Sequence, residues 1–143
     1  MSQGISDLVQ VGASPTTRSV LEDLRDDGHI ADLMDGYRLA IAAAIAFARK
    51  PRHGERGERR TMFAAGNLDP DMSLRSAIAE IYPDARTWPY RAAEDLAEQG
   101  AEILRNSMDG EEIWFDDLMR RIEDVNLGDH AEEDQTKQAE ATP

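Results

Sequence analysis

Residues 39–48 read LAIAAAIAFA and contain no polar or charged side chain. A helix with apolar residues on every side is typical of the interior of a protein. The apolar pattern continues upstream at spacings of three and four, through Ile30, Leu33, Met34 and Tyr37. The run is well short of the roughly 20 residues that a membrane span requires, so we expect no membrane contact. We therefore predict a central buried helix that begins near residues 30–32 and ends near residue 48.

The segment before this helix has the boundary residues of another helix. Ser14 and Pro15 are favoured at the cap and at the first position of a helix, and Gly28 is favoured after its last turn. We predict a helix from residue 15 to about residue 27. Residues 5–13 alternate weakly between apolar and polar side chains, which indicates a short strand or an extended arm.

Three further helices are predicted in the second half of the chain. Asp69, Pro70 and Asp71 begin one at about residues 70–82, and Pro83 ends it. The next runs from about residue 88 to 107. The last, at about residues 111–125, carries apolar side chains on one side and Glu111 and Glu112 at its start, where negative charge is favourable.

These elements predict an all-α fold. A chain of 143 residues fits one domain. We expect a compact bundle of about five helices, preceded by the short strand or arm, in a single domain over residues 1–126. Residues 127–143 are acidic and almost free of apolar side chains, so they cannot offset the entropy cost of ordering, and we expect a disordered tail there.

The charge is distributed unevenly along an acidic chain. Residues 1–48 carry a net charge of −4, residues 49–60 one of +4 and residues 61–143 one of −13. Such a surface repels phosphate and attracts basic partners, which disfavours general wrapping by duplex DNA. The chain has no Cys, and its N-terminus lacks the pattern of a secretory signal, so we expect a cytoplasmic protein without disulfides.

Residues 49–60 read RKPRHGERGERR and hold six of the 16 Lys and Arg residues of the chain. The segment contains Pro51, Gly54 and Gly57 and no apolar side chain, which predicts an exposed loop. Its cations are the candidate contacts to nucleic acid or to an acidic partner, and they are Arg49, Lys50, Arg52, Arg56, Arg59 and Arg60. The alternative is that they neutralise the acidic surface of the protein itself.

Candidate metal and catalytic residues do not form a specific motif. Asn67, Asp69 and Asp71 have the alternating oxygen ligands that begin a calcium-binding loop, but the glycine and the bidentate acid that such a loop needs later are missing. Capping of the following helix by Asp69 explains the same residues. The three histidines are too dispersed for a helical zinc site. We therefore expect no catalytic residue, metal or cofactor, although an enzyme whose site is assembled by folding stays open.

Aromatic residues give the remaining candidate contacts. Trp and Tyr are enriched where proteins bind one another, which makes Trp88 and Tyr90 candidate partner contacts. Trp114 has the spacing of a core residue. Tyr37 lies on the apolar stripe and Arg38 beside it, so we expect an interior aromatic residue and an exposed cation.

The order of strand, helix, glycine turn and helix in residues 1–48 matches the outline of a ribbon-helix-helix module. Such modules read DNA with outward-facing strand residues. Here the outward set would be Leu8, Gln10, Gly12 and Ser14, which includes no cation. A DNA-binding regulator or antitoxin of this kind is an alternative function.

Residues 20–52, VLEDLRDDGHIADLMDGYRLAIAAAIAFARKPR, place an Asp before the apolar helix and a basic loop after it. The segment resembles small accessory proteins encoded beside DNA phosphorothioation and other bacterial phage-defence systems. The resemblance covers about a quarter of the chain and depends on Leu24, Gly28, Ile30, Asp35, Ala40, Ala42 and Ala43. It implies a context in phage defence and does not imply a reaction.

The leading hypothesis is a non-catalytic acidic interaction protein, an accessory subunit of a bacterial protein assembly. Its acidic face would bind a basic protein partner, and residues 49–60 would contact nucleic acid or an acidic partner. The apolar surface of the central and the last helix also favours a homodimer.

Overall fold

The computed structural model describes residues 7–54, 57–109 and 115–124. The predicted disordered tail and the start of the last predicted helix lie outside these residues. The described elements occur in the order β1 (Gln10–Ala13), α1 (Pro15–Asp26), α2 (Leu33–Ala46), β2 (Arg60–Ala64), α3 (Ala65–Leu68), α4 (Ser73–Ile81), the 3-10 turn η1 (Pro83–Ala85), α5 (Pro89–Met108) and α6 (Phe115–Glu123). The fold is mostly helical, as the sequence predicts.

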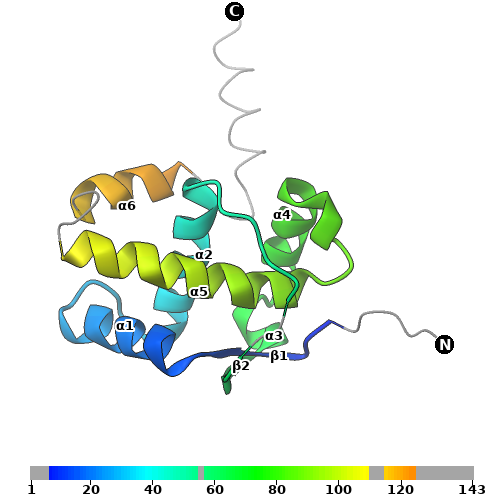
Figure 1. Cartoon of the computed structure of the whole chain (residues 1–143), viewed down its shortest axis with the longest axis horizontal. Coiled ribbons are helices and arrows are strands. Elements are labelled where there is room, and N and C mark those ends of the chain that lie inside the picture. The colour runs from blue at the N-terminus through cyan, green and yellow to red at the C-terminus, as the bar shows by residue number, and fades with distance from the viewer. Residues whose placement is uncertain (1–6, 55–56, 110–114, 125–143) are drawn as a thin grey trace, which may run out of the picture.

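Helices α2 and α5 form the centre of the molecule. Figure 1 shows α5 crossing the middle, with α6 on one side of it and α1 and the strands on the other. The apolar run becomes the buried half of α2, where Ala40, Ile41, Ala43 and Ala44 are each 0% exposed. Gly100 of α5 faces this run so closely that a Cβ atom on it would overlap the carbonyl group of Ala40. Small side chains on both helices therefore permit an unusually close approach of two backbones.

The ends of the first two helices agree with their predicted caps. The hydroxyl of Ser14 accepts a hydrogen bond from the Thr17 amide, and Pro15 is the first residue of α1. The helix ends at Asp26, and Gly28 follows with a φ of 83°. Asp32 caps α2 by accepting a hydrogen bond from the Asp35 amide.

The strand β2 is a correction to the predicted all-α fold. Residue 60 was expected to end an exposed loop, but it begins a strand that pairs antiparallel with β1, with Val11 opposite Phe63 and Gly12 opposite Thr61. The register shifts between Val11 and Gly12. A five-residue strand with no alternating pattern gives no sequence signal by itself, because its order depends on hydrogen bonds to a segment far away in the chain.

The outward set expected for a ribbon-helix-helix module is also corrected. Gly12 and Ser14 are buried, and a Cβ atom on Gly12 would lie 2.6 Å from the carbonyl oxygen of Arg60. Gln10 is exposed and Leu8 is half-buried. The strand thus presents much less outward surface than the alternation predicts.

The segment around Asp69 forms two helices instead of one. The short helix α3 was not predicted, and α4 begins at Ser73, three residues after the predicted start. The two carboxylate oxygens of Asp69 accept hydrogen bonds from the amides of Leu74 and Arg75, at 2.9 and 3.0 Å. Asp69 therefore caps the first turn of α4, as predicted, although Met72 occupies the N-cap position itself.

Among the described helices, none has the length and apolar character needed to span a membrane.

The close approach of α2 and α5 predicts a large effect of one methyl group. Gly100→Ala should lower the free energy of unfolding by about 2–3 kcal/mol, because the new Cβ atom forces two packed helices apart. Urea denaturation followed by circular dichroism measures the change.

The matched control is Gly66→Ala in α3, where an added Cβ atom has no neighbour within 4 Å. That change should be neutral or stabilising by about 0.5 kcal/mol, because alanine favours a helix more than glycine does. Equal effects of the two substitutions would show that the helix contact does not limit stability.

Candidate functional site

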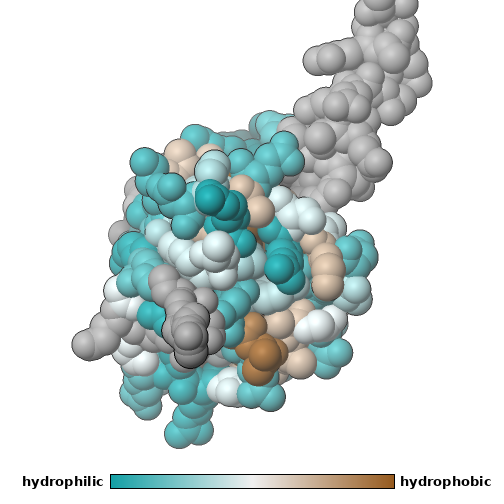
Figure 2. Space-filling model, turned by 90° about the vertical axis from the view of Figure 1, so that its right-hand side faces the viewer, coloured by the Kyte–Doolittle hydropathy of each residue, from teal (hydrophilic) through white to brown (hydrophobic). Residues whose placement is uncertain are grey.

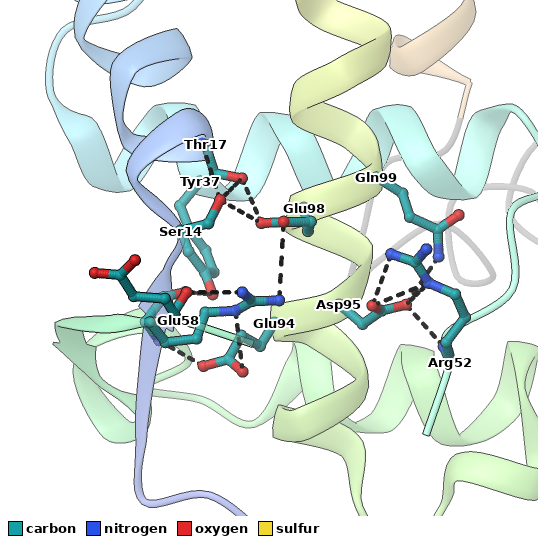
Figure 3. A network of polar contacts seen from close by, with 11 residues as sticks. Ser14, Thr17, Tyr37, Arg52, Glu58, Glu94, Asp95, Glu98 and Gln99 are labelled. Carbon is teal, nitrogen blue, oxygen red and sulfur yellow. Dashed lines mark hydrogen bonds and ion pairs between the residues drawn. The ribbon is translucent and has the colours of Figure 1, made fainter. Parts of the chain in front are cut away.

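Helix α5 carries a row of carboxylates that face the basic segment and the N-terminal strand. Figure 3 shows Glu94 and Glu98 directed toward β1 and α1, and Asp95 and Gln99 directed toward Arg52 on the other side of the helix. A cavity of about 300 Å³ lies at this place, between the carboxylates and the arginines at positions 52, 59 and 91. The candidate site is this polar network, which joins three distant parts of the chain.

Glu94 is the buried member of the row, with 2% of its side chain exposed. Its Oε2 atom accepts a hydrogen bond of 2.8 Å from the amide of Gly12 in β1. Its Oε1 atom lies 3.7 Å from Nε of Arg59, whose side chain is 12% exposed. Because a buried acidic side chain is costly without a partner, the guanidinium of Arg59 stabilises Glu94 inside the protein.

Glu98 extends the network to the start of α1. Its Oε1 atom accepts hydrogen bonds from the hydroxyls of Ser14 at 2.8 Å and Thr17 at 2.6 Å, and its Oε2 atom lies 3.9 Å from Arg59. Tyr37 of α2 donates its hydroxyl to the carbonyl of Gly12 at 2.8 Å. The side chains of α2 and α5 therefore satisfy both polar backbone groups of Gly12 on the edge of β1 that faces away from β2.

Arg52 and Asp95 form a bidentate pair on the other side of α5. Nη2 and Nε of Arg52 lie 3.0–3.2 Å from the Asp95 oxygens, and the Arg52 amide donates a further hydrogen bond of 2.7 Å. The hydrogen bond to Asp95 raises the pKa of Arg52 above its usual value. Gln99 joins the group by donating to Asp95 and to the carbonyl of Lys50. The basic segment is thereby fixed along α5.

The six predicted cations do not form one surface. Arg52 and Arg59 pair with the carboxylates of α5, and the side chain of Arg59 is only 12% exposed where an exposed loop residue was expected. Lys50 and Arg60 are exposed, and neither takes part in an ion pair among the described residues. Arg49 is half-buried, and its carbonyl accepts a hydrogen bond from Tyr82. Arg56 lies outside the described residues.

The two aromatic candidate contacts lie largely inside the protein. Trp88 is 8% exposed, and its ring lies 4.4 Å from that of His53, so it has little surface to offer a partner. Tyr90 is half-buried and donates its hydroxyl to Asp69 at 2.9 Å. Burial and this hydrogen bond raise the pKa of Tyr90 to about 12. Trp114 lies outside the described residues.

The polar network was not found in the sequence. Its carboxylates are spaced one and four residues apart on α5, but a chain with 29 acidic residues contains many such pairs. Asp7 was missed for the same reason: it accepts hydrogen bonds from the amides of Tyr90 and Arg91 and so caps α5 from more than 80 positions away. One faint signal was available, since Gly12 interrupts the predicted strand and glycine often marks a close contact.

The network holds β1, α1 and the basic segment against α5. Within residues 7–54, 57–109 and 115–124, no group of three His, Cys, Asp or Glu side chains is arranged to hold a metal ion. The carboxylates are engaged by hydroxyls, amides and arginines. We derive no reaction from this arrangement.

No family model matches the chain, and no curated protein and no solved structure is significantly similar to it.

The burial of Arg59 predicts a difference between two arginines of the same segment. Arg59→Met should lower the free energy of unfolding by about 3 kcal/mol, because it leaves Glu94 as a buried charge without its cation. Arg52→Met should cost less than about 1 kcal/mol, because the Arg52 side chain is 64% exposed. Chemical denaturation of both variants measures the two values, and equal costs would contradict the buried pair.

The environment of Tyr90 predicts a loss of stability in alkaline solution. Its pKa is 10.0 in an ordinary setting and about 12 in the fold, so the phenol ionises first in the unfolded chain. The contribution of Tyr90 to stability is complete below pH 10 and declines as the pH rises toward 12. Denaturation midpoints across this range should fall less steeply in Tyr90→Phe than in the wild type, and parallel curves would refute the assignment.

Proposed function

We propose that this protein is a non-catalytic interaction protein that binds a basic surface of another protein, as an accessory subunit of a larger assembly. The observation that carries the proposal is the pairing of two cations of the basic segment with acids of the same chain. Arg52 and Arg59 are paired with Asp95, Glu94 and Glu98 of α5. These two positive charges therefore stabilise the fold, and the chain as a whole keeps a net charge of −13.

The charge balance supports a basic partner over nucleic acid. The chain has a net charge of −13, and duplex DNA binds proteins mainly by exchanging its counterions for Lys and Arg. In the described part of the basic segment, Lys50, Arg52 and Arg60 are exposed, and Arg52 is paired with Asp95. The two exposed cations that are left without an ion pair there are few for binding a duplex, while acidic surfaces accelerate association with basic proteins.

A role in phage defence and a homodimer are two further proposals, and fewer observations support them. The first depends on the resemblance of residues 20–52, for which the comparisons with known proteins give no support. The second depends on apolar surface, and the described residues leave few large apolar side chains exposed: Val9 at 81%, Met72 at 56% and Ile81 at 45%. Figure 2 shows one small, strongly hydrophobic spot on a mostly hydrophilic face.

The test is a pair of binding measurements on the purified protein. A labelled DNA duplex should show no binding at low salt, whereas a protein captured from the native host should bind through a basic surface and be released as salt rises. Duplex binding whose affinity falls by about 0.9 log units per log unit of salt for each phosphate, and which is lost in Lys50→Ser/Arg60→Ser, would refute the proposal.

A further inference from the structure

A second, larger hollow lies away from the polar network. It has a volume of about 720 Å³ and lies between α2, the segment that joins α3 to α4, and α6. Figure 1 shows the end of α2 between α6 and α4. We call it the α2–α6 groove.

The floor of the groove is apolar. Its side chains come from α2, α3, α4 and α6 and are Leu39, Ala42, Leu68, Leu74 and Ile122. Leu39 is half-buried and the other four are buried. Met72, which lies next to the groove residues Asp71 and Ser73 in the chain, is 56% exposed and adds apolar surface near one side. A docked chain would bury this surface and gain free energy from its removal from water.

The rim of the groove is acidic. Asp35 of α2, Asp71 before α4 and Glu123 of α6 line it and are exposed. Hydrogen bonds from Ser73 lower the pKa of Asp71 below its usual value, so that this carboxylate stays ionised. The rim therefore presents negative charge from three separate elements.

Arg38, the cation that lines the groove, already makes hydrogen bonds inside the protein. Nη2 and Nε of Arg38 donate hydrogen bonds to the carbonyl of Leu68 at 2.7 and 3.1 Å. Arg38 thus holds α2 against the end of α3, in place of the exposed cation that the sequence predicts. Asp69, a fourth acid of the groove, is 3% exposed and is used as the cap of α4. The exposed rim charges of the groove are left with an acidic excess.

We infer that the α2–α6 groove binds an amphipathic helix of the partner that has apolar residues on one side and Lys or Arg on the other. The apolar side would pack mainly on the half-buried Leu39 and on Met72, which is 56% exposed, and the cations would pair with Asp35, Asp71 and Glu123. This is the recognition of a helix in a groove, with charge at the rim setting the choice of partner. The inference rests on the proposed function and adds the place and the form of the contact.

Charge argues against two other occupants. Residues 125–143 of the same chain hold five acidic residues and one Lys, so they would be repelled by the rim. A second copy of the chain has a net charge of −13 and carries the same disadvantage. A basic helix is the occupant whose charge complements the groove.

The test uses the full chain and two synthetic peptides with the same helical pattern of Leu. One peptide has Lys at the polar positions and the other has Glu. Binding is measured by fluorescence anisotropy, and amide chemical shifts locate the contact. The Lys peptide should bind and shift amides along the groove, and the Glu peptide should not bind.

Matched variants distinguish the effect of charge at the rim of the groove from the effect of the net charge of the protein. Asp35→Lys/Glu123→Lys reverses the rim and should weaken the Lys peptide by about tenfold or more, because each change removes an attraction and adds a repulsion. Asp23→Lys/Glu102→Lys changes the net charge equally at exposed positions that do not line the groove, and should change affinity by less than about twofold. Thermal melts of both variants confirm that they are folded.

Four results would overturn the inference while leaving the proposed function intact. They are failure of the Lys peptide to bind, equal loss of affinity in both variants, shifts that map away from the groove, and a wild-type dimer that the rim reversal dissociates. A fifth such result is occupation of the groove by residues 125–143 of the same chain. To detect it, a nitroxide spin label is attached to Gln135→Cys, which is the only cysteine in that variant because the chain has no Cys. If these residues occupied the groove, the label would broaden the amide signals of the groove in the absence of peptide. Duplex binding, in contrast, would refute the proposed function itself.

Discussion

The close contact between α2 and α5 is the constraint on which the rest of the structure depends. Gly100 lets the backbone of α5 approach the carbonyl of Ala40, and Ala40, Ala43 and Ala44 are completely buried. Two helices that approach so closely bury their small side chains efficiently but leave little room between them for large ones. Larger residues such as Leu21, Ile78 and Leu104 fill the space around the pair, and the other helices are placed by them.

The sequence predicted the helices well because their signals are local. The run at residues 39–48, the cap at Ser14 and the glycine after α1 each depend on a few neighbouring residues, and the structure agrees with all three. The features that it did not predict are set by contacts without a hydrophobic period. β2 pairs with β1, which is far away in the chain, and the first turn of α4 is capped by Asp69 from five positions upstream. Neither relation has a period that a short window can detect.

The candidate site was predictable in kind and not in detail. Concentrated basic charge in an acidic chain is visible in the sequence, and neutralisation by the chain's own acids was one of the two alternatives it left. Which arginine is the less exposed could not be predicted, since the segment has no apolar pattern that would direct Arg52 or Arg59 toward the interior. Their different fates follow from position along α5: Arg59 lies between β1 and the helix, while Arg52 lies on the outer side.

The bonds of the first described residues have a consequence for the order of folding during synthesis. Asp7 caps α5, and Gly12 is held by Glu94, at separations of 82 to 84 residues. β1 leaves the ribosome before residues 60–64 and before α5, so its hydrogen bonds to both must wait until they have followed. β1 is thus made before the segments that fix it, and its contact with Glu94 forms only when α5 has emerged.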